Sequence, residues 1–229
     1  IGDMLANLES RPPIENMGAN ALQSIRHGRD FRFQTLVGTM LSPQTRDEQT
    51  SAAFHSLTEL VSPYTLCAES LGIQSEVNIA QAISMVSFYK IKARNLLEAA
   101  RRCVSEYRGD IPDRIEDLLS FRGVGPKVGY LTFTIARNET HGICVDTHVH
   151  RIANRLGWAD TAMVKSNGPE KTRIQLETWV EKKYWGDVNS RVVAFGQSIC
   201  TAKAPKCSSC TLVDSCLFFK SCDGEDRGW

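Results

Sequence analysis

Four cysteines crowd into 17 residues near the C-terminal end of the chain, in the segment CTAKAPKCSSCTLVDSC. They are Cys200, Cys207, Cys210 and Cys216, and their spacing is C-x6-C-x2-C-x5-C. A C-x2-C pair curls so that both sulfurs reach one metal centre, and the longer loops bring two more thiolates around it. A chain of 229 residues can fold on its core alone, so this clustering indicates metal binding in a reducing compartment and not a secreted disulfide scaffold.

Three of the other four cysteines lie far from this cluster. Cys67, Cys103 and Cys144 are scattered in apolar or helical contexts, where cysteine packs as a small hydrophobe. Within the cluster, four thiolates suit either tetrahedral zinc or an iron–sulfur cluster. Zinc is the default for a C-x2-C pair, but the six- and five-residue loops do not repeat the C-x2-C…C-x2-C pattern of zinc ribbons. The spacing leaves both metals open.

The rest of the chain has the period of amphipathic helices. In FRFQTLVGTML (31–41), apolar residues recur at helical spacing, and no sustained two-residue alternation occurs in the chain. The expected helices are 31–41, 46–61, 89–107, 113–121, 126–137, 147–158, 168–184 and 188–200. Asp113 is the expected N-cap of the fourth, and SRPPIEN (10–16) is expected to be an extended arm. The sequence therefore predicts an all-α fold.

The composition argues against a membrane protein and excludes few other classes of protein. The chain is 42% hydrophobic and 23% charged, and its longest apolar runs are far shorter than a membrane span, so no membrane partner is expected. Its net charge of +1 argues neither for nor against nucleic acid.

A glycine-rich turn in FRGVGPKVGY (121–130) precedes one of the expected helices. Gly123 and Gly125 have no Cβ, so the chain can turn tightly and bring backbone N–H groups close to a phosphate oxygen. Pro126 suits the first helical position, and Lys127 follows it. The spacing G-x-x-x-x-G-K-[ST] of a nucleotide-binding loop is absent. Alone, such a turn would often only change the direction of the chain.

Four blocks of sequence in this order, followed by the cysteine cluster, resemble the endonuclease III family of DNA glycosylases. The blocks are MLSPQTRDEQ (40–49), SFYKIKARNL (87–96), FRGVGPKVGY (121–130) and VDTHVHRIANRLGW (145–158). In that family, four cysteines at this spacing bind a [4Fe–4S] cluster. The resemblance covers nearly the whole chain and is stronger to the eukaryotic branch.

This resemblance implies two helical domains that flank a DNA-binding cleft. A six-helix domain is expected at 30–140, with a helix–hairpin–helix at about 113–137. Residues 1–29 and 141–229 are expected to form a discontinuous iron–sulfur cluster domain.

The resemblance also implies an activity. The chain is expected to be a bifunctional DNA N-glycosylase and AP lyase that removes oxidised pyrimidines from duplex DNA in base-excision repair. Lys127 matches the lysine whose amine attacks C1′ of the sugar and forms a Schiff base, a reaction favoured by a helix N-terminus and by desolvation. Asp146 in VDTH matches the carboxylate that activates the lysine or stabilises the sugar cation. It is also the expected N-cap of the helix 147–158.

Several further residues are expected to contact the DNA. The hairpin backbone at Gly123, Val124 and Gly125 would bind phosphate, and Gln44 matches a residue that fills the gap left by a flipped base. Phe88 matches a wedge position and His148 a histidine near the pocket. Without the resemblance, Gln44 would be assigned to a turn and Phe88 to the core.

For several other polar residues, the sequence leaves open whether they contact DNA. For His150, Arg151 and Arg155, a phosphate contact competes with an exposed polar helix face. Lys203 and Lys206 in the cysteine loop either face phosphates or are simply solvated. The family usually has Leu-Pro before the first glycine, whereas this chain has Phe121-Arg122. Arg122 either adds a phosphate contact or is tolerated at an exposed turn.

Two other functions are open. A monofunctional mismatch glycosylase generally lacks lysine at the position of Lys127, and a non-catalytic helix–hairpin–helix DNA-binding protein would require neither Lys127 nor Asp146. The expected partner is double-stranded damaged DNA, bound by a monomer. The expected location is the nucleus, with the mitochondrion as an open alternative. Because the chain begins at Ile1, we expect it to be trimmed, with any targeting segment outside it.

Overall fold

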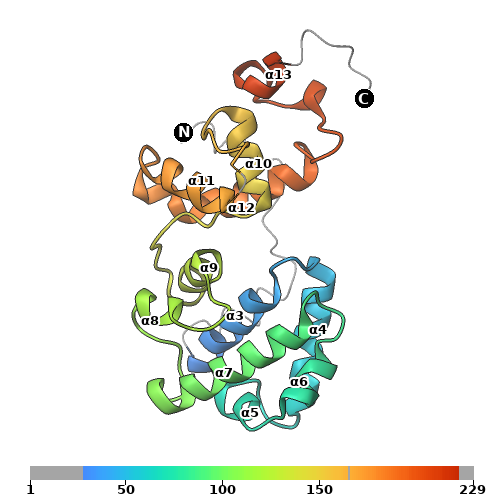
Figure 1. The fold of residues 1–229 in the computed structure, drawn as a ribbon, viewed down its shortest axis with the longest axis vertical. Helices are drawn as coiled ribbons and strands as arrows, with labels where there is room; N and C mark the ends of the chain where they lie inside the picture. The colour runs from blue at the N-terminus through green and yellow to red at the C-terminus, as the bar shows by residue number, and fades with distance from the viewer. Residues whose placement is uncertain (1–27, 165, 222–229) are drawn as a thin grey trace. The chain divides into compact units, whose positions relative to one another are not determined.

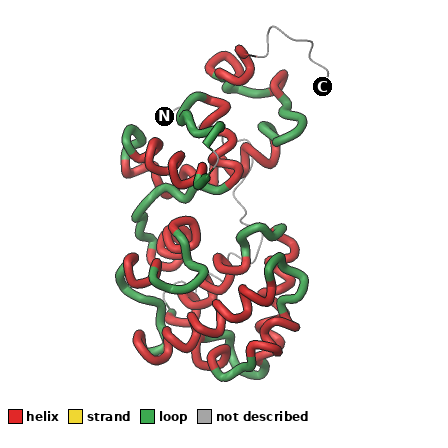
Figure 2. Tube along the Cα trace, viewed as in Figure 1, coloured by secondary structure: helices red, strands yellow, loops and turns green. Residues whose placement is uncertain are grey.

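The computed structural model describes residues 28–164 and 166–221. Within these ranges every regular element is a helix and no strand is present (Figure 2). The prediction of an all-α fold is therefore confirmed for this part of the chain. None of the helices in the described ranges is long and apolar enough to cross a membrane. The arm expected at 10–16, and residues 1–27 of the segment expected to join the discontinuous domain, lie outside the described residues.

The described residues divide into two compact units, and the boundary along the chain falls between His141 and Gly142. Seven helices belong to the described part of the first unit (Figure 1). They are α3 (Arg29–Leu41), α4 (Asp47–Val61), α5 (Ala68–Gly72), α6 (Glu76–Ala82), α7 (Tyr89–Tyr107), α8 (Ile115–Leu119) and α9 (Pro126–Arg137).

Helix α3 organises the core of the first unit. Seven of its thirteen residues are buried, and it packs against α9, α4 and α7. A buried hydrogen bond joins the hydroxyl oxygens of Thr39 on α3 and Thr132 on α9, 2.7 Å apart. Each hydroxyl also bonds a carbonyl of its own helix, Leu36 for Thr39 and Val128 for Thr132, so the pair adds a polar link between the two helices.

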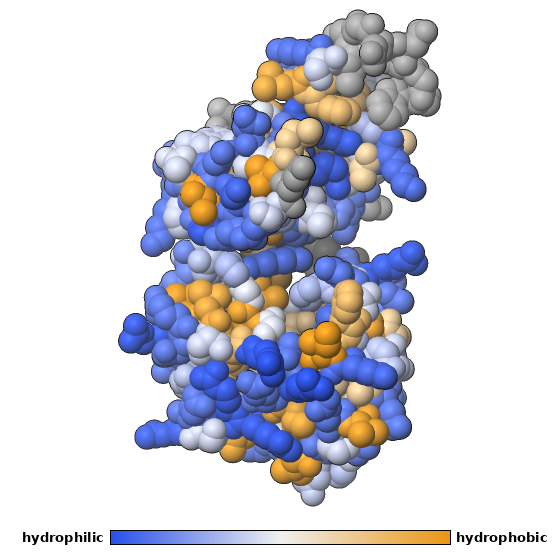
Figure 3. Space-filling view, viewed as in Figure 1, coloured by the Kyte–Doolittle hydropathy of each residue, from blue (hydrophilic) through white to orange (hydrophobic). Residues whose placement is uncertain are grey.

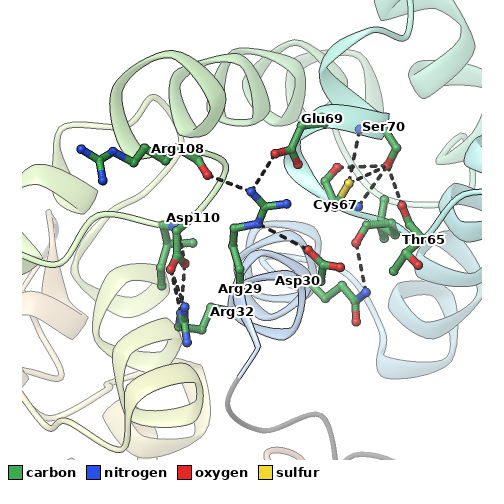
Figure 4. A network of polar contacts seen from close by, with 12 residues as sticks. Arg29, Asp30, Arg32, Thr65, Cys67, Glu69, Ser70, Arg108 and Asp110 are labelled. Carbon is green, nitrogen blue, oxygen red and sulfur yellow. Dashed lines mark hydrogen bonds and ion pairs between the residues drawn. The ribbon is translucent and has the colours of Figure 1, made fainter.

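A polar network fixes the C-terminal end of α7 (Figure 4). Arg29 donates to the carbonyl oxygen of Arg108 at 2.9 Å and pairs with Glu69 at 2.9 Å. Arg32 forms a two-pronged ion pair with Asp110, in which Nε lies 2.9 Å from Oδ1. Since α7 has 19 residues, its other end lies about 28 Å away. That N-terminal end belongs to the candidate interface described below.

The second unit has its own hydrophobic core. Helix α10 (Thr147–Leu156) packs against α11 (Gly168–Glu177), α12 (Trp185–Ser198) and α13 (Leu217–Ser221). Ile152 and Val192 are fully buried in this core. Short 3-10 turns occur at η1 (Lys182–Tyr184), η2 (Cys207–Ser209) and η3 (Val213–Ser215).

Three local features differ from the sequence-based expectation. The helix expected over 168–184 ends at Glu177, because Val180 turns into the core and its carbonyl accepts from Trp185 Nε1 at 2.8 Å. The N-cap assignment of Asp113 is wrong: Arg114 is the N-cap, and Asp113 pairs instead with Arg137 at 2.8 Å. Helices α5 and α6 were not predicted, since five and seven residues are too few to show a clear period.

Candidate nucleic-acid interface and cysteine site

Helices α8 and α9 are joined by a tight turn that requires glycine. The N–H of Val124 donates to the carbonyl of Phe121 at 3.0 Å, and Gly123, at the third position of this turn, has a φ of +83°. A Cβ there would also lie 2.5 Å from Asn95 Nδ2. Backbone conformation and close approach therefore both demand glycine.

The start of α9 is open. Gly125 is its N-cap residue and makes no side-chain cap, and no atom lies within 4 Å of the place where its Cβ would be. Pro126 occupies the first turn, as expected, and Lys127, at the second helical position, is half-buried. Val124 is buried in the core, so only its backbone can contact a ligand. An uncapped helix start with open space beside it is a suitable site for a phosphate oxygen.

The Phe121-Arg122 pair has a structural explanation. The Phe121 ring is buried, with the Arg102 guanidinium 4.3 Å from its centroid and the Tyr107 ring 6.0 Å away. Phe121 therefore closes the base of the hairpin by packing. Arg122 is exposed and forms a 3.9 Å ion pair with Glu98, also at the surface. Such exposed pairs contribute little to stability.

One cavity of the first unit brings together three of the predicted DNA-contact residues, Gln44, Phe88 and Gly123. They come from three separate segments: the loop after α3, the start of α7, and the hairpin. The remaining lining residues are Met40, Pro43, Ile91, Lys92 and Asn95.

Gln44 and Phe88 share an unusual backbone conformation. Their φ angles are +54° and +57°, in the left-handed region that side chains other than glycine rarely adopt. The sequence alone would have assigned Phe88 to the core. Its side chain is 61% exposed, so that assignment does not apply. Most of the visible surface is hydrophilic, with hydrophobic side chains gathered in several groups (Figure 3). Left-handed non-glycine residues cluster at functional sites, where a side chain must be presented at some cost.

In the second unit, Asp146 caps α10 as predicted. Its Oδ1 accepts from the N–H groups of His148 and Val149, both at 2.8 Å. Both bonds use the same oxygen, which leaves Oδ2 outside the cap. The ring of His148 is half-buried against α12, where a Cβ on Gly196 would lie 2.8 Å from its Nδ1.

His150, Arg151 and Arg155 make contacts within the second unit. The sequence had left open whether they contact phosphate or form an exposed polar helix face. Arg151 donates to the carbonyl of Cys200 at 2.8 Å, and Arg155 donates to Thr201 and Ala202 carbonyls at 2.8 and 2.9 Å. His150 Nδ1 lies 2.7 Å from Thr172 Oγ1, and burial lowers its pKa.

The two arginines therefore hold the loop that begins at Cys200, a role that sequence reasoning missed. Their spacing of four residues, which puts both on one helix face, was the available signal.

The four clustered cysteines line one cavity, together with Arg155, Phe195 and other residues. No disulfide joins any of them. Burial raises the pKa of the Cys210 thiol, and the nearby Cys200, Cys207 and Cys216 raise it further. No group of three or more His, Cys, Asp or Glu side chains in the described ranges has the geometry of a metal-ion site. Lys203 and Lys206 are exposed on the same loop.

Sequence comparison identifies related proteins. Residues 37–182 match the HhH-GPD superfamily of base excision DNA repair proteins. Endonuclease III homolog 2, chloroplastic, of Arabidopsis thaliana is 40% identical over 222 residues, which cover 93% of this chain and 56% of that protein. The endonuclease III homolog of Encephalitozoon cuniculi is 36% identical over 213 residues, covering 89% of this chain and 86% of the homolog. The chain thus spans little more than half the length of the Arabidopsis relative.

The fold is also similar to solved structures. A trapped endonuclease III–DNA covalent intermediate superposes with a TM-score of 0.75 at 24% sequence identity. The match covers 96% of this chain and 97% of that one.

Proposed function

Because the chain belongs to the HhH-GPD superfamily, and within it to the endonuclease III family, we propose that it is a bifunctional DNA N-glycosylase and AP lyase of base-excision repair. Its proposed substrates are oxidised pyrimidines in duplex DNA. The observation that supports this most directly is the uncapped, open start of α9, with Lys127 at its second position. One structural neighbour is an endonuclease III trapped as a covalent intermediate with DNA.

In the proposed reaction, the neutral amine of Lys127 attacks C1′ of the deoxyribose. The C1′–N bond breaks, and the base leaves with the electron pair and takes up the proton that the attacking nitrogen loses. The C1′–O4′ bond then breaks, O4′ takes up a proton from water, and a protonated Schiff base joins C1′ to Lys127. Loss of a C2′ proton then eliminates the 3′ phosphate and nicks the strand. The carboxylate of Asp146 is proposed to accept a proton or to stabilise positive charge on the sugar.

The DNA contacts divide between backbone and side chains. The hairpin backbone at Gly123, Val124 and Gly125 is proposed to bind the phosphate backbone without reading sequence. The N–H of Val124 is used by Phe121 within the turn, so the donors to phosphate would be the other N–H groups of the hairpin. Gln44 is proposed to fill the gap left by the flipped base, Phe88 to wedge against the opposite strand, and His148 to line the pocket. The left-handed backbone of Gln44 and Phe88, in one cavity, supports a role in presenting their side chains.

Borohydride trapping on a thymine-glycol duplex tests this function against its alternatives. The Schiff base would be reduced to a stable amine, so we expect a covalent protein–DNA adduct through Lys127. A monofunctional mismatch glycosylase would release a base without an adduct. A non-catalytic binding protein would bind the duplex and release nothing. Either of these results would overturn the proposal.

Phe88 provides a test that separates function from stability. Phe88→Gly is expected to change the free energy of unfolding by less than about 1 kcal/mol, since relief of the left-handed backbone offsets the greater freedom of glycine in the unfolded chain. The same variant is expected to release base severalfold more slowly, because the wedge is lost, whereas Phe88→Leu retains activity. Urea unfolding and single-turnover kinetics measure the two effects. Strong destabilisation of Phe88→Gly with undiminished turnover would identify Phe88 as a packing residue.

We also propose that Cys200, Cys207, Cys210 and Cys216 bind a [4Fe–4S] cluster. The fit rests on four thiols that surround one cavity, where the charge of each thiolate opposes that of the others and a metal centre would stabilise them all. The cluster would act structurally, by closing the loop that presents Lys203 and Lys206.

Metal analysis decides between this cluster and zinc. Protein purified without oxygen is expected to contain about four iron and four sulfide per chain. Cys210→Ser is expected to lose most of this iron. Cys67→Ser should keep it, because Cys67 only caps α5 and serine caps equally well. A colourless protein with one zinc would contradict the assignment.

For the whole protein, we propose a monomer that acts on damaged duplex DNA in the nucleus, with the mitochondrion as a second location. Light scattering in solution tests the monomer, because a stable dimer would double the measured mass.

A further inference from the structure

Lys92 makes contacts that the proposed chemistry does not use. It lies on α7, half-buried, in the cavity that also contains Gln44 and Phe88. Its Nζ donates to the carbonyl oxygens of Leu41 at 2.6 Å and Pro43 at 2.8 Å, and to Thr45 Oγ1 at 2.9 Å. A lysine ammonium has three N–H donors, and each has an acceptor here.

These three acceptors enclose Gln44 along the chain. Leu41 is the last residue of α3, and Pro43 and Thr45 are the two neighbours of Gln44. Carbonyls at a helix C-terminus have no partner within the helix, and Lys92 supplies one for Leu41. The loop therefore depends on a side chain from about fifty residues further along the chain.

Gln44 needs this support. Its left-handed backbone costs on the order of 1–2 kcal/mol, and such a conformation persists only where surrounding contacts impose it. The amine of Lys92 is partly desolvated, and this burial lowers its pKa to about 8. At neutral pH, Lys92 therefore remains mostly protonated and can donate all three hydrogen bonds to the loop.

The same helix face also supports the hairpin. Asn95, one turn beyond Lys92, is 8% exposed and lies directly beneath Gly123. Lys92 and Asn95, three residues apart, point to one side of α7, and Phe88 is the N-cap residue that precedes this helix. All three line the cavity. One face of α7 thus contacts or presents each of the three DNA-contact segments of this unit.

We propose that Lys92 is the positioning residue for Gln44: by binding Leu41, Pro43 and Thr45, it holds Gln44 in the conformation that fills the gap beside a flipped base. This inference rests on the proposed function. Lys92 acts through Gln44 and touches no reacting atom.

A double-mutant cycle tests this dependence. Lys92→Met keeps the length of the side chain and removes its donors. We expect it to slow single-turnover base release from a thymine-glycol duplex by roughly 10-fold or more. In a Gln44→Ala background, the same substitution should add less than about a twofold effect, because interacting residues are not additive.

Two further variants complete the experiment. Lys171→Met removes the same charge from an exposed position on α11 and should leave the rate within about twofold of wild type. Thr45→Val removes one of the three acceptors of Lys92, and we expect it to disturb the fold less than Lys92→Met does. It should give a smaller loss that also disappears with Gln44→Ala, so the test remains valid if Lys92→Met does not fold.

The outcomes separate this inference from the proposed function. If wild type releases base but the Lys92 and Gln44 effects simply multiply, Lys92 does not act through Gln44 and the inference is wrong. An unchanged rate for both Lys92→Met and Thr45→Val would also overturn it. If wild type itself forms no adduct and releases no base, the proposed function fails first.

Discussion

Lys127→Gln is expected to abolish both base release and strand nicking while leaving DNA binding intact. Glutamine keeps most of the length and polarity of lysine but has no nucleophilic amine. We expect the rate of base release to fall on the order of 10⁴-fold or more, as for other deletions of a nucleophile. The borohydride adduct should disappear with it, because no Schiff base can form.

The fold should not change in this variant. Lys127 occupies the second position of α9, where glutamine has nearly the same helix propensity as lysine. The free energy of unfolding should stay within about 0.5 kcal/mol of wild type. Affinity for a duplex with a reduced abasic-site analogue should also be retained, since the hairpin backbone supplies the proposed phosphate contacts.

Lys171→Gln, on α11, is the matched control for loss of charge. Its trapping yield should equal that of wild type. Full nicking activity in Lys127→Gln would show that a different amine is the nucleophile. The assignment of Lys127 would then be abandoned, although membership in the family would stand.

Asp146→Asn is expected to separate the two roles of this residue. An asparagine Oδ1 can accept the same bonds from His148 and Val149, and asparagine is as good an N-cap as aspartate. Stability should therefore change little. The negative charge is lost, so single-turnover base release should fall by roughly 10²–10⁴-fold, the range for removal of an acid–base group.

Asp146→Ala provides the comparison. It removes both the cap and the charge, and should cost about 1 kcal/mol of stability in addition to the same loss of rate. If the two variants lose activity equally and differ only in stability, charge and capping are separate functions. If Asp146→Asn turns over at the wild-type rate, Asp146 is a cap and nothing more.

Local features of the fold were predictable from neighbouring residues. The helices at 31–41, 89–107 and 126–137 follow from apolar spacing, and α3, α7 and α9 lie there within two residues. The cap at Asp146 follows from its place before a periodic segment. The Asp113 cap was wrong: the cap residue is Arg114, one position later, and the Asp113 carboxylate pairs with Arg137, 24 residues away. A contact with so distant a partner does not appear in a local pattern.

In the candidate site, too, some features depend on neighbouring residues and others on contacts between distant segments. Glycine at 123 is demanded by the turn itself, which neighbouring residues define. The contacts of Lys92 with the Gln44 loop, and of Asn95 with the hairpin, join segments 28 to 51 residues apart. Both residues look like ordinary positions on an amphipathic helix. Arg151 and Arg155 look like a solvated helix face, yet they bind the loop of the first cysteine.

The sequence by itself determined the all-α class, the glycine turn before Lys127 and the grouping of the four cysteines, because each depends on residues close together in the chain. Only the tertiary structure decided which side chains support these features. Lys92 meets the Gln44 loop, Phe121 closes the hairpin base, and two arginines hold the cysteine loop. These contacts depend on how helices pack, and packing satisfies buried donors and acceptors with partners from distant parts of the chain.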